Sequence, residues 1–489
     1  MLEAITILYL FLPHIIFYFG WLTLFWAIFL TFLLSYLVIP TFRLALNDYS
    51  LILKKDIVYQ VFITLVVAVA WTSLSGAGGW GFQNGDWIKH NAVLKDMIQH
   101  SWPVSWNHIQ QESQTGDYRL IYYIAYYLPS ALIGKMSSWQ GANTAIFLWT
   151  LLGVWLSLLW FTKLTGAKNF WPLILLAVYF VLANGFGRVV DWFIQSGVLK
   201  HSSDILWWKG ADLWDYNGNT VGLFWAPQHT LAGWLCSSLL LNVYFFSSTQ
   251  RGALVIPFVA ALLWSPFVAV GLIPLLAAIM IRHKTLKYSQ FLSIVPALFF
   301  MLVFATYYHS LSYPLEWRIY TPQYLFSKHL VLRFILFYLI NAGSYVLLLF
   351  YFNHTESEEE SDKLLIFTAA LGLFLIVLIR VGHLNDFCLR VSIPCLMILW
   401  VLTGQRLVYF FKNHRLTINS IILIMFIVLG SGSFLKYTGQ SISHYKICPP
   451  DWRNIKPVFR INNNKGDEYL PRQYIGRKND SLFFRVFGK

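Results

Sequence analysis

The chain has 489 residues, of which 57% are hydrophobic and 12% are charged, and its formal net charge is +14. This composition excludes an ordinary soluble globular protein, because it leaves too few polar residues to cover a fold in water. It predicts a polytopic membrane protein, and the spans must be helices, since a helix pairs all its own backbone groups in lipid. Cys236, Cys388, Cys395 and Cys448 show no paired spacing, so we expect neither a disulfide framework nor a zinc site.

Apolar runs long enough to cross a bilayer recur along the chain. Residues 4–42 contain no Asp, Glu, Lys or Arg and are interpreted as two spans of a retained anchor, since a basic n-region and a cleavage site are missing. We expect an all-α protein with about 13 transmembrane helices, within a range of roughly 11–14. The expected spans are 5–20, 21–40, 57–76, 142–162, 170–187, 222–246, a pair of short broken helices within 252–281, 288–308, 329–352, 364–380, 390–409 and 417–435.

The basic loops predict the orientation. If residues 41–56 are cytoplasmic, the short loops that carry most of the remaining Lys and Arg fall on the same side, as the positive-inside rule requires. The N-terminus is then cytoplasmic, and the outward-facing polar segments are 77–141, 188–221, 309–328 and 381–389. The run Tyr118–Gly134 is expected to be an amphipathic helix lying in the interface, because a further crossing would put the basic loops outside.

This orientation defines the expected organisation of the chain. Residues 1–435 form a transmembrane domain, made of an N-terminal hairpin (1–56), a central module (57–390) and the last spans (391–435). Residues 436–489 form an extramembrane tail with eleven Lys and Arg against four Asp and Glu. We interpret this tail as solvated near anionic headgroups, and because no nucleic-acid-binding motif accompanies it, a nucleic-acid partner is not expected.

The loop Gly78–Val104 is the first candidate site. Its residues Trp87–Gln99 have the spacing of a short amphipathic helix at the membrane surface, on which Asp86 and His90 share a face. Shielding by the surrounding tryptophans would raise the pKa of Asp86, as suits a general base near neutral pH. Composition alone equally allows Asp86 to be a helix cap and the tryptophans, Trp87 included, to be interfacial anchors.

The other three outward-facing segments, and the start of one span, carry further candidate residues. Asp191 in GRVVDWF could share the site of Asp86 or pair with Arg188, and Gln228 with His229 opens a span in WAPQHTLAGW, where the pair could bind an anion or a sugar hydroxyl. Arginines at spans are costly unless they pair or bind an anion. The segment RVGHLNDFCLR therefore offers a phosphate site or a structural ion pair, and its residues are Arg380, His383, Asp386 and Arg390. Glu316 and Arg318 are weaker candidates for the same outer cavity.

Taken together, the layout resembles the integral-membrane GT-C glycosyltransferases, which include oligosaccharyltransferases, protein O-mannosyltransferases and aminoarabinose transferases. In that superfamily an aspartate in the first external loop is the catalytic base, and Asp86 in QNGDWIKH occupies that place. An interfacial helix after it, here YRLIYYIAYYLPSALIGK, and a second acidic loop with Asp191 also match this arrangement. Some members carry a DE or DxD pattern, and this chain has neither. No motif therefore supports a divalent cation, and no other cofactor is expected.

The resemblance implies transfer of a sugar from a polyprenyl-phosphate donor to an acceptor hydroxyl, with inversion, in cell-envelope glycan biosynthesis. Asp86 would be the base and Asp191 the second acid. Arg380, Arg390 and His383 would hold the donor phosphate, while the substrate would contact Trp87, His90, Gln228, His229, Glu316, Arg318 and Asp386. The implied partners are the lipid-linked sugar, a glycan, lipid or protein acceptor, and membrane lipids, with the site on the exterior or periplasmic face of the plasma (inner) membrane.

Other classes stay open. A polysaccharide polymerase or ligase would use a lipid-linked oligosaccharide, whereas a secondary transporter or lipid flippase would show internal repeats and ionisable residues at the midplane. A non-catalytic assembly subunit is a further alternative. The charged residues of this chain crowd one expected membrane face, which favours a surface-facing enzyme. The chain lacks the P-loop, HExxH and GxSxG motifs, which argues against ATP-driven transport and standard hydrolase chemistry.

Overall fold

A computed structural model describes most of the chain. Its described residues are 1–47, 55–111, 114–187, 189–190, 192, 214–246, 252–283, 288–311, 317–327, 330–356, 361–382, 385–412, 417–461, 473–478 and 481–489. Among the candidate residues, Asp191, Glu316 and His383 lie outside these ranges. Their predicted roles therefore stay predictions.

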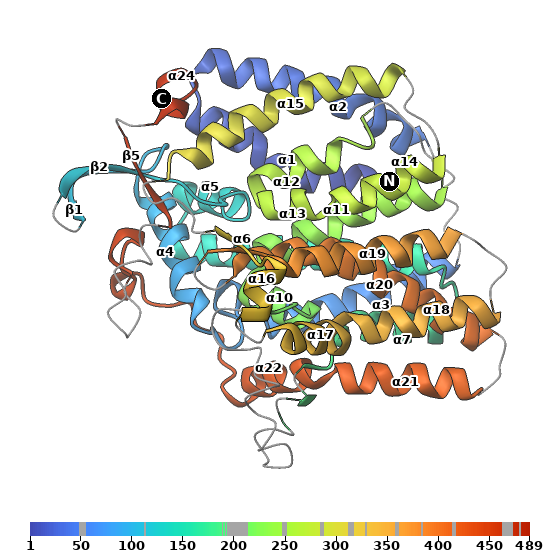
Figure 1. Cartoon of the computed structure of the whole chain (residues 1–489). Coiled ribbons are helices and arrows are strands. Elements are labelled where there is room, and N and C mark those ends of the chain that lie inside the picture. Colours follow the sequence, from blue (N-terminus) through green and yellow to red (C-terminus); the bar gives the residue numbers. More distant parts are fainter. Residues whose placement is uncertain are drawn as a thin grey trace.

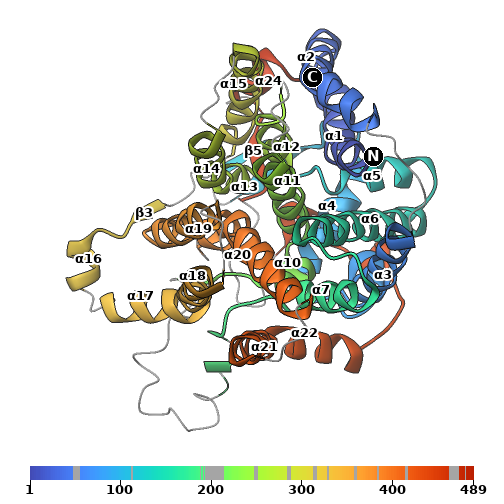
Figure 2. The ribbon, with the colours of Figure 1, turned by 90° about the vertical axis from the view of Figure 1, so that its right-hand side faces the viewer.

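The protein is a bundle of helices that run side by side, which Figure 2 shows nearly end-on. The longer members are α1 (Leu2–Trp21), α2 (Leu24–Asn47), α3 (Lys55–Ser73), α6 (Trp139–Thr165), α7 (Phe170–Leu182), α11 (Pro227–Phe246), α15 (Tyr288–His309), α18 (Ser344–Glu356), α19 (Ser361–Val377), α20 (Asp386–Lys412) and α21 (Ile418–Gly430). Helix α20 is the most central of the candidate spans, since 83% of its apolar window is buried inside the protein. This burial explains how a span can carry Arg390 and Asp386 near its start.

Seven helices in the described ranges are long and apolar enough to cross a membrane, or eight if the bent pair α21 and α22 (Gly432–Ser443) counts as one span. This supports a mostly helical integral membrane protein, but 13 spans are not found in the described ranges. Three of the missing spans are shorter apolar helices, at Ile57–Ser73, Phe170–Leu182 and Lys363–Val377. The hydropathy of a segment predicts that it is buried, but it does not fix the length of unbroken helix.

Prolines divide the segment 252–283 into short helices. Pro257 and Pro266 stand in the first turns of α12 (Ile256–Trp264) and α13 (Pro266–Gly271), and Pro274 is the second residue of α14 (Ile273–His283). Proline is tolerated there because the first N–H groups of a helix have no partner within it. We expected a pair of short broken helices that returns the chain to its starting side, whereas Pro266–His283 is by itself one of the seven candidate spans.

Small elements gather at one end of the bundle, on the left of Figure 1. They include α4 (Asp86–Gln99), α5 (Leu128–Met136) and a sheet of order β1-β2-β5, made of β1 (Ser105–Gln111), β2 (Gln114–Leu120) and β5 (Ile475–Arg477). Other short elements are η1 (Ala77–Gly79), α10 (Asn219–Trp225), β3 (Trp317–Ile319), α16 (Pro322–Ser327), α17 (Val331–Tyr338), η3 (Leu339–Gly343), β4 (Ile379–Val381), η4 (Trp452–Asn454), η5 (Val458–Arg460) and α24 (Leu482–Val486).

The expected interfacial helix at Tyr118–Gly134 is wrong for most of its length. Tyr118 belongs to strand β2, and helix begins only at Leu128. The tyrosines expected to face the membrane interface are inside the protein, since Tyr122 is 4% exposed and Tyr126 and Tyr127 are 0% exposed. The aromatic run therefore packs as core beneath α4, and the phenol groups make hydrogen bonds within the protein.

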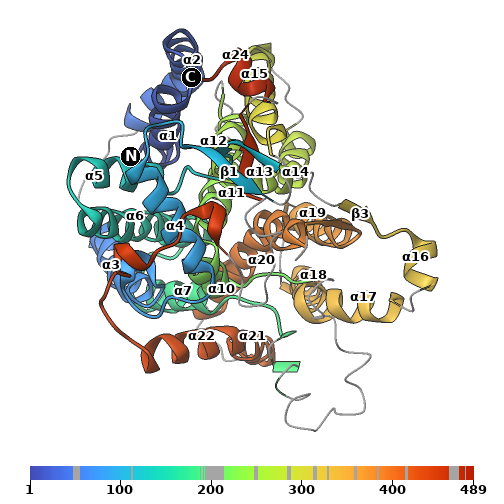
Figure 3. The same cartoon turned by 90° about the vertical axis from the view of Figure 1, so that its left-hand side faces the viewer.

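The tail is not a free solvated segment in its described parts. Its residue Ile447 forms an isolated β-bridge with Trp80, its strand β5 pairs with β2, and the Lys489 carbonyl accepts a 2.7 Å hydrogen bond from Arg119. At the turn before α4, Gly79 has φ of +82°, and a Cβ there would lie 2.6 Å from the Pro449 Cα. The tail and the Asp86 loop thus lie at the same end of the bundle (Figure 3).

Candidate functional site

Helix α4 presents Asp86 at its first turn. The side-chain oxygen of Asn84 accepts a hydrogen bond from the Asp86 N–H at 3.0 Å, and the Asn84 amide donates to the Phe224 carbonyl at 2.7 Å. Asn84 therefore provides the side-chain acceptor at this helix start, and the Asp86 carboxylate is used differently. It forms an ion pair with Lys89, one turn along the helix, at 3.1 Å.

The electrostatic surroundings of Asp86 reverse the expected pKa shift. Its side chain is 40% exposed, while that of Lys89 is 11% exposed. Burial alone would raise the pKa of Asp86, but the positive charge of Lys89, helped by that of Arg390, lowers it below the ordinary value. The expectation of a raised pKa is therefore wrong, because it considered the tryptophans and overlooked the lysine. Asp86 is an ionised carboxylate at neutral pH.

Trp87 and His90 anchor α4 on the helix α10. Their side chains are 2% and 1% exposed, and both donate to carbonyls of α10: Trp87 Nε1 to Phe224 at 3.1 Å and His90 Nε2 to Trp225 at 2.9 Å. Because a carbonyl only accepts, His90 Nε2 carries the proton, and Nδ1 accepts from the Tyr127 hydroxyl. Burial and the nearby Lys89 lower the pKa of His90 to about 3, so it is neutral.

A second ion pair lies at the start of α20. Arg390 donates to Asp386 at 2.9 Å, one helical turn apart, with side chains 14% and 23% exposed. The Arg390 guanidinium also stands 5.6 Å from the ring centres of Tyr123 and Phe267. The pairing considered as the structural alternative for Arg390 is thus present.

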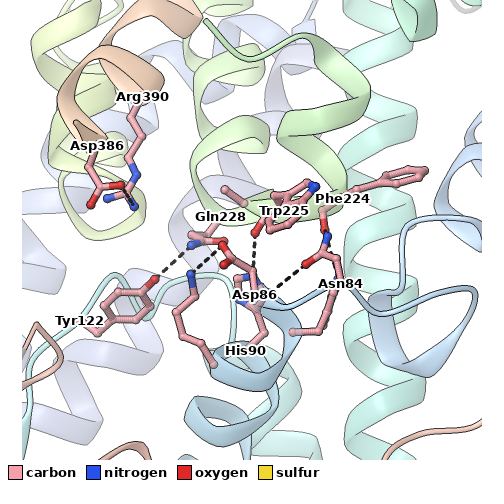
Figure 4. A network of polar contacts seen from close by, with 12 residues as sticks. Asn84, Asp86, His90, Tyr122, Phe224, Trp225, Gln228, Asp386 and Arg390 are labelled. Carbon is pink, nitrogen blue, oxygen red and sulfur yellow. Dashed lines mark hydrogen bonds and ion pairs between the residues drawn. The ribbon is translucent and has the colours of Figure 1, made fainter. Parts of the chain in front are cut away.

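Figure 4 shows Asp86, Tyr122, Asp386 and Arg390 in one region. Together with Lys89 and Tyr474, which interact electrostatically with these residues, they define the polar cluster. Arg390 acts electrostatically on both Asp86 and Lys89, and Tyr122 and Tyr474 lie close enough to both cations to interact with them electrostatically. Tyr122, Asp386, Arg390 and Tyr474 also line a cavity of about 30 Å³. A cavity of this size has room for water but not for a sugar, which would need the surrounding side chains to move.

The polar cluster is the main evidence for function, because comparison with known proteins gives no match. No protein-family model, curated protein or solved structure matches this chain. The resemblance to GT-C glycosyltransferases therefore has only the arrangement of segments behind it. The chemistry has to be argued from the side chains.

Gln228 and His229, at the start of α11, lie beside the cluster. Both are fully buried, Gln228 donates to the Tyr122 hydroxyl at 3.3 Å, and His229 Nδ1 contacts Ser265 Oγ at 2.7 Å. Within the described part of the chain, Gln228 Oε1 and His229 Nε2 are buried and make no hydrogen bond. The His229 ring also lies edge-on to Tyr123 at 4.9 Å. These two atoms can serve a polar ligand or ordered water without breaking existing bonds.

Arg380 and Arg318 are placed elsewhere. They are direct partners across a two-stranded ribbon of β3 and β4, where Arg318 donates to the Tyr324 hydroxyl at 2.9 Å and Arg380 bonds the side chain of Tyr320. Arg390, in contrast, pairs with Asp386 and stands beside the rings of Tyr123 and Phe267. Arg380 and Arg390, expected to share one phosphate, therefore have different neighbours.

Three members of the cluster were missed by sequence reasoning as site residues. Lys89 had a detectable signal, since it follows Asp86 by one helical turn, whereas Tyr122 was assigned to an interfacial helix. Tyr474 had none, because it lies in the tail, far along the chain from α4. Over the described ranges, no group of three or more His, Cys, Asp or Glu could hold a metal ion.

Proposed function

We propose that the protein is a membrane glycosyltransferase of GT-C type, which transfers a sugar from a polyprenyl-phosphate donor to an acceptor hydroxyl at the α4 end of the bundle. The observation that carries the proposal is the combination of a partly exposed, ionised Asp86 with two largely buried cations, Lys89 and Arg390. Base catalysis needs the carboxylate, and a departing phosphate needs the cations. The proposed face is the exterior or periplasmic one.

The donor phosphate is assigned to Lys89 and Arg390. Both are long cations held in place on helices. Arg390 lines the cavity together with Tyr122 and Tyr474, and Lys89 interacts electrostatically with Arg390 and with the same two tyrosines. Arginine offers a planar fork that matches two phosphate oxygens, and lysine adds a compact charge. Arg380 is not part of this assignment, because its neighbours are on the β3–β4 ribbon.

The chemical step is a single displacement. The acceptor hydroxyl gives its proton to the Asp86 carboxylate while its oxygen bonds to the anomeric carbon. The bond from that carbon to the phosphate oxygen breaks, its electron pair goes to the lipid phosphate, and the configuration inverts. Lys89 and Arg390 stabilise the negative charge that develops on the phosphate. The balance requires no metal and no covalent sugar intermediate.

The test uses the full chain in lipid nanodiscs with a panel of radiolabelled polyprenyl-phosphate hexoses and envelope lipid extract as acceptor. We expect Asp86→Asn to reduce sugar transfer by ~100-fold or more, because the amide cannot take a proton, while binding of polyprenyl phosphate stays close to wild type. The control is Asp451→Asn, which removes an exposed carboxylate paired with Arg453. Near-normal transfer by Asp86→Asn would reject the role of this residue.

Two outcomes would assign another activity. Processive growth of a chain from a lipid-linked oligosaccharide would identify a polymerase or ligase. Movement of the lipid donor across the bilayer without any bond cleavage would identify a flippase. The position of both ion pairs at one end of the bundle favours transfer at a membrane surface, because a transport site would be expected near the midplane.

A further inference from the structure

The β3–β4 ribbon has two chemically different faces. Strand β3 (Trp317–Ile319) pairs antiparallel with β4 (Ile379–Val381), with Trp317 opposite Val381, Arg318 opposite Arg380 and Ile319 opposite Ile379. Directly opposite residues share a face, and successive residues alternate between faces. One face is therefore made of Trp317, Ile319, Ile379 and Val381, and the other carries the two arginines.

The apolar face is exposed. Trp317 is 71% exposed and Ile319 is 53% exposed, and Phe326 of the adjoining helix α16 is 68% exposed. On the other face, the two guanidinium groups contact the tyrosines Tyr324 and Tyr320 that follow β3. An exposed apolar side with an aromatic residue, backed by a cationic side, is the pattern of an element lying in the headgroup region of a membrane.

The position of the ribbon agrees with its composition. Strand β4 joins the end of α19 to the start of α20, so the ribbon lies level with the ends of two helices of the bundle. The backbone N–H of Tyr320 donates to the Leu378 carbonyl at 2.7 Å, which holds the ribbon there. Beyond it, α16 and α17 project sideways from the bundle (Figures 2 and 3). The next turns of α20 carry Asp386 and Arg390, so the ribbon is at the same end as the polar cluster.

We propose that the β3–β4 ribbon, together with α16, is a membrane-surface anchor that binds the phosphates of anionic phospholipids. Trp317, Ile319 and Phe326 enter the boundary between headgroups and acyl chains. Arg318 and Arg380 face lipid phosphates, which also offset the repulsion between two like charges placed directly opposite each other. This anchor is independent of the proposed transfer reaction, because it involves none of the residues of the polar cluster.

The first experiment measures depth in the membrane. Cys448 is exposed and the other three cysteines are buried, so Cys448→Ser with Trp317→Cys gives one labelling position. With bimane at position 317 in nanodiscs, we expect strong quenching by lipids brominated on the acyl chain and weak quenching by aqueous iodide. Bimane on the native Cys448 is the control and should be quenched by iodide. The same iodide quenching at both positions would overturn the proposal, and protection of position 317 from both quenchers would indicate a protein partner instead.

The second experiment measures the preference for anionic lipid. The two brominated lipids, phosphatidylglycerol and phosphatidylcholine, are compared at equal mole fractions by their quenching of bimane at position 317. At low salt, the quenching should report a local preference for phosphatidylglycerol of about fivefold for each arginine. The double variant Arg318→Gln, Arg380→Gln should lose this preference and keep the depth of the label, and high salt should weaken it in the parent protein. Equal quenching by the two lipids at low salt in the parent protein would overturn the phosphate-binding part.

Discussion

A prediction for the stability of the protein concerns Asp96, which connects α4 to the C-terminal tail through a hydrogen bond. Its side chain is 1% exposed and accepts a 2.7 Å hydrogen bond from the Val458 N–H. Lys95 holds the same stretch by donating to the carbonyls of Trp452 and Ile455 at 2.8 and 2.7 Å. Burial raises the pKa of Asp96 to about 7, although the Val458 hydrogen bond and Lys95 act in the opposite direction.

The direction of the pH effect follows from this pKa. Because the folded-state pKa lies above the 3.8 of an unperturbed aspartate, the protonated carboxyl stabilises the fold fully below about pH 4, and this contribution is lost as the pH rises through about 7. The difference between these pKa values corresponds to about 4 kcal/mol. Asp96→Asn keeps the acceptor for Val458 and cannot ionise. Its advantage over wild type should therefore grow from near zero at pH 4 to about 4 kcal/mol at pH 8.

The assay is hydrogen exchange of the Val458 amide, together with thermal unfolding, on the full chain in nanodiscs at pH 4 and pH 8. If exchange requires the tail to open, 4 kcal/mol corresponds to protection about 1,000-fold greater in Asp96→Asn than in wild type at pH 8. Asp451→Asn, which changes an exposed carboxylate of the same tail, should gain no stability as the pH rises. An Asp96→Asn variant whose advantage is the same at both pH values, or that is less stable at pH 8, would refute the reasoning.

Three further predictions follow from the site and the turn before it. Lys89→Met should weaken binding of polyprenyl phosphate by about tenfold or more, because it removes a charged partner of the phosphate. Titration by native mass spectrometry measures this affinity. An unchanged affinity would show that Lys89 is a partner of Asp86 only. Activity should fall only at acidic pH, as the pH passes through the depressed pKa of Asp86, and a loss centred near pH 6.5 would point to a histidine instead. Gly79→Ala should lower the free energy of unfolding by more than ~1 kcal/mol, because φ of Gly79 is +82° and the new Cβ would meet Pro449. The control is Gly439→Ala, whose Cβ would have no atom within 4 Å and which should be neutral or stabilising. Thermal unfolding measures both variants.

Local pattern in the sequence was enough to predict the membrane class and α4. The apolar residues Ile88, Ala92, Val93 and Met97 predicted this helix, which spans Asp86–Gln99. The structure buries the last three, whereas Ile88 is 62% exposed. The same pattern was insufficient for Tyr118–Gly134. There the aromatic residues were compatible with a lipid interface and with a protein core, and only the pairing of β2 with β1 and β5 decides between them.

The site shows the same division. The sequence by itself determined which residue types stand near the ends of apolar helices, and so it found Asp86, Gln228, His229 and Arg390 as candidates. Tertiary structure decided that Arg390 and Tyr474 lie close enough to Lys89 to act on it electrostatically, and that Arg380 belongs to a ribbon. The physical reason is that helix periodicity and hydropathy depend on near neighbours in the chain. Electrostatic fields and packing depend on residues brought together from hundreds of positions away, and these contacts are fixed only when the bundle and its tail assemble.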